Sequence, residues 1–152
     1  MAGVREGSWA GFAQEAPELA RDVRTAFAVR KHCTMATLRA DGAPRISGTE
    51  VQLVDDDELH IGSMPGALKA RDLLRDPRVA IHSPTVDPPE GDERSWAGEA
   101  KVAGRAVEVP SDDASHRFRI DVDEVVHTAV DGGGLRIRSW HRGRGLQERT
   151  RS

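Results

Sequence analysis

The first part of the chain carries apolar residues at helical spacing. Between residues 12 and 27 an apolar side chain recurs every three to four positions, which is the period of one helix face. Pro17 is tolerated only in the first turn of a helix, so the predicted helix begins near Ala16. Residues 1–11 show no such period and are expected to form an irregular lead-in.

After residue 32 the pattern changes to short alternating segments separated by turn residues, as in antiparallel strands. Asp41-Gly42 predicts a tight hairpin, and Gly132–Gly134 predicts a second hairpin loop near the end of the chain. Gly98 and Gly104 fall inside one predicted strand and indicate a bulge or a tight bend. Strands at this spacing favour a small closed barrel. The predicted strands are 33–39, 45–54, 58–62, 78–83, 97–109, 123–130 and 135–141.

Two further segments are predicted to be helical. The apolar positions between residues 64 and 75 return to the helical period, with Pro65 in the first turn and Ser63 as the preferred N-cap. Residues 110–118 contain a serine that can cap a second, shorter helix.

The composition of the chain excludes several classes of function. The chain has 152 residues, enough for one domain spanning 1–152, with residues 142–152 expected to form a basic tail. Lys+Arg 22 against Asp+Glu 25 gives a net charge of −3, whereas nucleic-acid-binding domains carry a basic excess. No apolar run is long enough to span a membrane, and no signal peptide is visible. We expect a cytoplasmic protein with neither nucleic acid nor membrane as a partner.

Most of the residue types that could form a metal or catalytic site lack the sequence pattern of such a site. The six histidines show no zinc-binding helical spacing, so no metal site is predicted. Cys33 excludes an intramolecular disulfide because it has no second cysteine to pair with, and nothing in the sequence identifies a base beside it. No serine lies in a hydrolase elbow, and the glycine-rich segments lack the setting of a dinucleotide fingerprint.

The most informative segment runs from Gly62 to Arg71, where a strand, a tight turn and a helix follow one another. A helix N-terminus presents free N–H groups to an anion, and Ser63 and Lys69 can add a hydroxyl and an ammonium. The spacing is not that of a P-loop. Helix capping and a solvated lysine explain the same residues equally well. Arg45, on a neighbouring predicted strand, can bring a guanidinium to the same rim.

At these residues the chain resembles the pyridoxamine 5'-phosphate oxidase-like split-barrel superfamily, whose members bind FMN or its deazaflavin analogue. The resemblance covers roughly residues 25–141 and rests on the order and spacing of several segments together. These are Thr37-Leu38-Arg39, Asp41-Gly42, Pro44-Arg45-Ile46, Leu59–Ser63, Leu68–Leu73, Asp76–Ala80 and Gly104–Val109.

The resemblance implies a mainly β fold: a six-stranded antiparallel split barrel of Greek-key type, forming a homodimer with FMN at the subunit interface. It also implies an oxidoreductase acting on a small-molecule substrate. Because a flavin carries the hydride chemistry itself, no catalytic side chain is named. The residues that the resemblance places at the cofactor are Arg45, Ile46, Ser47, Gly62, Ser63, Leu68, Lys69 and Glu99.

The chain also departs from the family pattern. Leu68 stands where the oxidase has an arginine, and Glu50 replaces an expected basic residue. The C-terminal substrate signature of the oxidase is absent. These departures leave three alternatives: a reductase that uses the deazaflavin coenzyme F-420, a non-catalytic flavin- or haem-binding module, and an interaction barrel without a cofactor.

Overall fold

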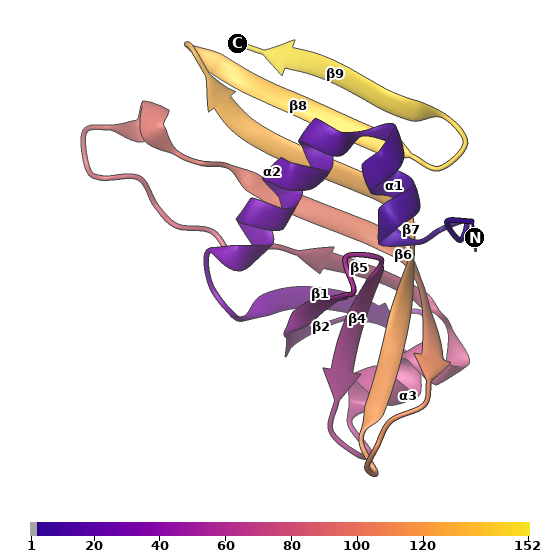
Figure 1. Ribbon diagram of the computed structural model, residues 1–152. Coiled ribbons are helices and arrows are strands. Elements are labelled where there is room, and N and C mark those ends of the chain that lie inside the picture. The colour runs from indigo at the N-terminus through magenta and orange to yellow at the C-terminus, as the bar shows by residue number, and fades with distance from the viewer. Residues whose placement is uncertain (1–2) are drawn as a thin grey trace.

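The computed structural model describes residues 3–152, which form one antiparallel sheet and three α-helices. Helices α1 (Trp9–Glu15) and α2 (Pro17–Ala28) lie across one face of the sheet, and α3 (Leu68–Arg75) lies at the other end of the molecule (Figure 1). A 3-10 turn, η1, spans Glu93–Ser95. The strands are β1 (Cys33–Leu38), β2 (Pro44–Thr49), β3 (Val51–Val54), β4 (Glu58–Ser63), β5 (Arg78–His82), β6 (Glu99–Val109), β7 (His116–Asp131), β8 (Gly134–His141) and β9 (Gly145–Arg151).

The sheet follows the order β2-β1-β5-β6-β7-β4-β3. The two strands at the ends of this path, β2 and β3, are consecutive in the chain and flank Glu50. The edges are therefore joined by the chain itself, not by a ladder of hydrogen bonds. The path has six strands when β2 and β3 count as one interrupted strand. The predicted mainly β, antiparallel split barrel is confirmed.

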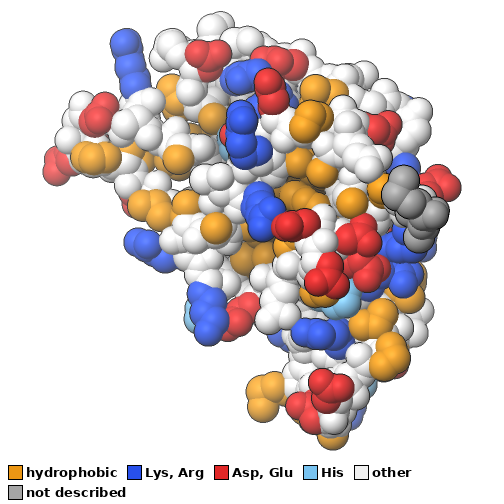
Figure 2. Space-filling view, in the orientation of Figure 1, with side chains coloured by type: hydrophobic (Ala, Val, Ile, Leu, Met, Phe, Trp, Pro, Cys, Tyr) orange, Lys and Arg blue, Asp and Glu red, His pale blue; other side chains and the backbone are white. Residues whose placement is uncertain are grey.

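The split lies along β7. The first part of this strand pairs with β4, from His116 to Ile120, and the later part pairs with β8, from Glu124 to Asp131. One long strand thus serves both the barrel and the β7–β8–β9 extension. On the helical face, acidic and basic side chains are interspersed (Figure 2), as expected for a chain whose opposite charges nearly balance.

The core lies between the helices and the sheet. Helix α2 buries Leu19 and Val23 on one face, as its period predicts. The predicted bulge in β6 is confirmed, because the β6–β7 register shifts between Ala103 and Gly104. A Cβ at Gly104 would collide with the backbone oxygen of Asp121. Only glycine lets β6 approach β7 this closely at the bulge.

The expected irregular lead-in is wrong for its last residues, because α1 begins at Trp9. The hydroxyl of Ser8 accepts a hydrogen bond from the Gly11 N–H at 3.0 Å and caps the helix. Trp9 and Phe12 are buried, and the Phe12 ring lies 5.0 Å from that of Trp140. A helix of two turns held by two aromatic anchors is too short to show a period in the sequence.

Two other expected elements differ from the structure. The helix expected within 110–118 is absent, because Asp113 accepts hydrogen bonds from Ser115 and holds a turn, after which β7 begins. The expected basic tail contains β9, which pairs along β8. Backbone pairing with β8 orders this segment although Leu146 is its one large apolar residue. None of the helices in residues 3–152 is long and apolar enough to cross a membrane.

Candidate functional site

A cleft of about 490 Å³ lies where β2, β3 and β4 approach the start of α3. Its wall combines backbone from three strands with side chains of both charges. Residues that matter for its chemistry are Gly48, Gln52, Gly62, Ser63, Lys69 and Arg117. Three of the sequence-predicted cofactor residues, Gly62, Ser63 and Lys69, are therefore brought together.

The turn between β4 and α3 is longer than the sequence predicts. Ser63 is not the N-cap: α3 begins at Leu68 and its N-cap is Ala67, which makes no side-chain capping hydrogen bond. The Ser63 hydroxyl instead donates to the Met64 carbonyl at 3.3 Å. Within residues 3–152 no side chain caps the first turn of α3. The Ala70 N–H donates to the Ala67 carbonyl oxygen at 3.1 Å, which leaves the N–H groups of Leu68 and Lys69 available to an anion.

Lys69 crosses from α3 to β2. Its Nζ donates to the carbonyl oxygen of Gly48 at 2.7 Å, and burial lowers the pKa of its ammonium group. An ammonium carries three donors, so this contact with Gly48 leaves two for a ligand. The lysine both fixes the width of the cleft and supplies positive charge to it.

Arg45 lies outside the lining of this cleft. Its Nε donates to Oδ2 of Asp72 at 2.7 Å, and Thr37 Oγ1 donates to the same oxygen at 2.7 Å. Burial raises the pKa of Asp72, but the hydrogen bonds from Arg45, Thr37 and Arg75 outweigh it and hold that pKa below its ordinary value. Arg45 thus docks α3 on the barrel, and the expected meeting of Arg45 with Ser63 at one rim is not seen.

The other sequence-predicted residues lie around the cleft or away from it. Ile46 and Leu68 are 74% and 54% exposed, and Ser47 is half-buried on β2. Glu99 is on β6, where its Oε2 lies 3.2 Å from Nε2 of His82. Cofactor contacts by these four residues stay predictions.

Sequence reasoning missed Arg117 and Gln52. The β4–β7 register places Arg117 opposite Gly62, and its Nη2 donates to Oε1 of Gln52 on β3 at 2.9 Å. Residues 110–118 were expected to form a helix, which hid this strand position. Only the pairing of β7 with β4 reveals that Arg117 lies at the cleft.

The cleft suits a ligand that carries a phosphate. Lys69 and Arg117 supply cations, and Ser63 supplies a hydroxyl. The floor is open, because a Cβ at Gly48 would meet nothing within 4 Å and one at Gly62 would meet only His116 O, at 3.9 Å. The carboxylate of Glu50 lies 3.7 Å from Lys31 and 3.4 Å from His32, which reduces its repulsion of an anion.

Two other features are weaker candidates for a functional site. A larger concavity of about 680 Å³ includes Arg78 and Arg142 in its lining, but neighbouring carboxylates already pair with these two arginines. Cys33 is 4% exposed, and burial raises the pKa of its thiol. A buried, protonated thiol is a poor nucleophile.

Comparison with known proteins identifies the family of the chain. The model of the pyridoxamine 5'-phosphate oxidase family matches residues 19–142, most of the chain. The chain belongs to the pyridoxamine 5'-phosphate oxidase family. No curated protein sequence matches it.

Solved structures of other proteins share the fold at low sequence identity. A pyridoxamine 5'-phosphate oxidase-related, FMN-binding protein from Nostoc punctiforme is 12% identical with a TM-score of 0.66, over 90% of this chain and 96% of that one. A haem-binding protein from Mycobacterium smegmatis is 16% identical with a TM-score of 0.58, over 88% of each chain. An F420 reductase is 17% identical with a TM-score of 0.51, over 67% of this chain and 94% of that one.

Proposed function

We propose that this family member binds FMN in the cleft between β2–β4 and α3 and acts as a flavin-dependent oxidoreductase. The observation that carries the proposal is the convergence of Lys69, Ser63 and the uncapped start of α3 on one open cleft. Membership of the family and the FMN-binding relative from Nostoc punctiforme support the choice of ligand.

The protein residues hold and orient the cofactor in this proposal. A bound flavin supplies the hydride or electron transfer. The Lys69 ammonium binds the phosphate through its charge, and the N–H groups of Leu68 and Lys69 at the start of α3 bind it as hydrogen-bond donors. The open floor at Gly48 and Gly62 leaves room for the rest of the cofactor to lie against the backbone of β2 and β4.

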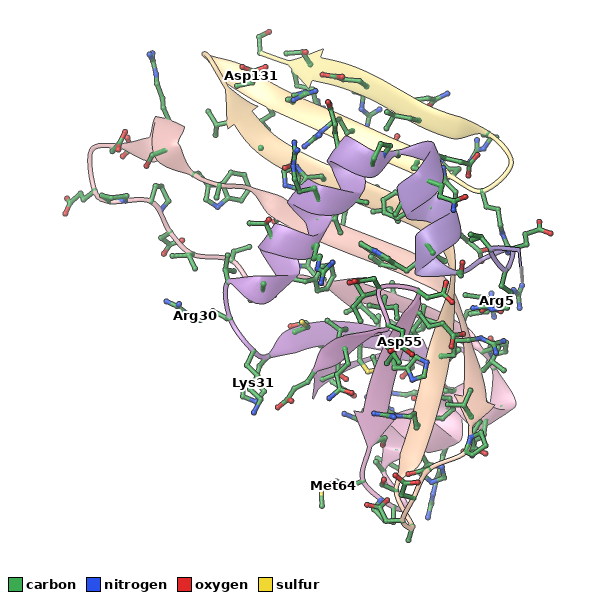
Figure 3. All side chains as sticks on the ribbon, in the orientation of Figure 1. Arg5, Arg30, Lys31, Asp55, Met64 and Asp131 are labelled. Atoms are coloured by element: carbon green, nitrogen blue, oxygen red, sulfur yellow. The ribbon has the colours of Figure 1, made fainter. Side chains whose placement is uncertain are left out.

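We also propose that the protein works as a homodimer. Large apolar side chains stand exposed around the cleft: Ile46 at 74%, Met64 at 78% and Leu68 at 54%. Met64 projects outward where β4 ends (Figure 3). Exposed apolar side chains gathered near a site favour an interaction surface, and a second copy packed there would cover the apolar residues beside the cofactor.

The first experiment is titration of the purified protein with FMN, followed by quenching of flavin fluorescence. The expected result is saturable binding and a yellow protein that transfers electrons from a reductant to an acceptor. Binding of coenzyme F-420 with none of FMN would assign the deazaflavin alternative. A colourless protein that binds neither would contradict the proposal.

Replacing Lys69 with alanine tests the phosphate contact. Loss of one charged hydrogen bond costs about 1.5–3 kcal/mol, which raises the Kd for FMN roughly 10- to 150-fold. Lys101→Ala is the matched control, since it removes the same charge from an exposed position on β6 outside the cleft. Equal affinities for the two variants would count against the site.

A further inference from the structure

Arg117 lines the cleft, although its strand, β7, is not one of the three strands that form most of the wall. It belongs to β7, opposite Gly62 of β4, and its side chain reaches past β4 to β3. There Nη2 donates to Oε1 of Gln52 at 2.9 Å. The cleft therefore receives a guanidinium from the strand that follows β6, far along the chain from Lys69.

No carboxylate of the described residues forms an ion pair with this guanidinium. Arg119, two residues along the same strand, has Asp121 at 3.1 Å and Glu58 at 3.7 Å. Arg45 has Asp72 at 2.7 Å. In residues 3–152, Arg117 makes no ion pair and its side chain bonds to the neutral amide of Gln52. Lys69 likewise bonds to a neutral carbonyl.

We propose that Arg117 is the second cation that grips the phosphate of the bound flavin, with Gln52 holding its guanidinium in position. This inference rests on the proposed FMN function. Gln52 engages one of the five N–H donors of the guanidinium, and the rest stay free to bind phosphate oxygens in a fork. Arg117 is a binding residue and Gln52 is a positioning residue.

Charge balance explains why a second cation is needed. A phosphate monoester carries about −1.5 to −2 at pH 7, more than one ammonium offsets. The neighbouring positions do not help, because Leu68 is apolar and Glu50 is an acid that Lys31 and His32 approach. Arg117 supplies the missing charge from across the cleft, so the phosphate lies between α3 and β7.

The test compares FMN with riboflavin, which lacks the phosphate, on wild-type protein and on Arg117→Gln. We expect Arg117→Gln to raise the Kd for FMN about 10-fold or more and to leave the Kd for riboflavin within about twofold. Arg119→Gln is the matched control, because it removes the same charge from the same strand, and it should leave the preference for FMN over riboflavin unchanged. Circular dichroism and thermal unfolding check that each variant is folded.

Arg117→Lys provides a second variant should the glutamine form fold poorly. A lysine keeps the charge but loses the fork, so we expect a loss of FMN affinity smaller than that of the glutamine form, again without effect on riboflavin. Gln52→Leu should weaken FMN binding by a few-fold through misplacement of the guanidinium.

Each outcome has one meaning. Wild-type protein that binds FMN, with Arg117→Gln and Arg117→Lys binding it equally well, overturns the assignment of Arg117 and leaves the flavin function standing. Equal losses for FMN and riboflavin overturn the phosphate contact. Wild-type protein that does not bind FMN overturns the proposed function together with this inference.

Discussion

Replacing Asp72 with asparagine removes the charge at the contact that docks α3, and with it Lys69, on the barrel. The Asp72 side chain is 3% exposed and its two oxygens accept three hydrogen bonds. Oδ2 accepts from Thr37 Oγ1 and Arg45 Nε, each at 2.7 Å, and Oδ1 accepts from Arg75 Nη2 at 3.1 Å. Asparagine keeps one of these oxygens and presents an NH2 group where the other was.

The expected cost is about 3 kcal/mol, the lower end of the range for breaking a buried ion pair. The lower end applies because the retained amide oxygen still accepts hydrogen bonds and the Arg45 side chain is 19% exposed, so water solvates it in part. For a domain of this size, 1 kcal/mol shifts Tm by about 2–4 °C. The variant should therefore melt roughly 6–12 °C below the wild type.

The loss should depend on pH in a defined direction. Hydrogen bonds hold the folded-state pKa of Asp72 below its ordinary value, while the unfolded chain titrates near about 3.9. A carboxyl with a depressed folded-state pKa stabilises the fold above its unfolded pKa, and this stability is lost as the pH falls through the folded-state value. The gap between wild type and Asp72→Asn should be constant from about pH 5 to 8 and narrow below about pH 4.

Urea unfolding followed by circular dichroism measures both effects at fixed protein concentration. Asp76→Asn is the control: hydrogen bonds from the side chain and the backbone N–H of Arg78 hold the pKa of Asp76 at about 2. Solvent screens this exposed pair, so its removal should cost less than removal of the buried contact. Asp72→Asn must lose clearly more. A free energy of unfolding equal to that of Asp76→Asn would refute the role of the buried contact.

Two further predictions concern the bulge and the assembly. Gly104→Ala should destabilise the fold by about 3 kcal/mol, because the methyl group would collide with the Asp121 backbone; Gly133→Ala, where a Cβ meets nothing within 4 Å, should be nearly neutral in the same urea unfolding assay. The homodimer should sediment as a dimer at micromolar concentration, and Ile46→Glu should dissociate it. A wild-type monomer, or a variant dimer of equal affinity, would contradict the proposed interface.

Local pattern and turn chemistry were enough to predict much of this fold. The period of α2, the hairpins at Asp41-Gly42 and Gly132–Gly134, and the β6 bulge at Gly104 were all predicted correctly. Each depends on residues close in the sequence, whose side-chain spacing or backbone freedom dictates the conformation. Helix α1 and strand β9 were missed because α1 is anchored by Trp140 and β9 by pairing with β8.

The candidate site, like the fold, was predictable from the sequence only in part. The segment from Gly62 to Lys69 determined by itself that a strand end, a hydroxyl and an ammonium lie near the start of a helix. Only the tertiary structure decided which cations lie at the cleft. Arg45 forms an ion pair with Asp72 instead, while the β4–β7 register brings Arg117 to the cleft. Local sequence fixes what a segment can form, but strand register and ion pairing depend on residues far apart in the chain, and only the packed fold brings those residues into contact.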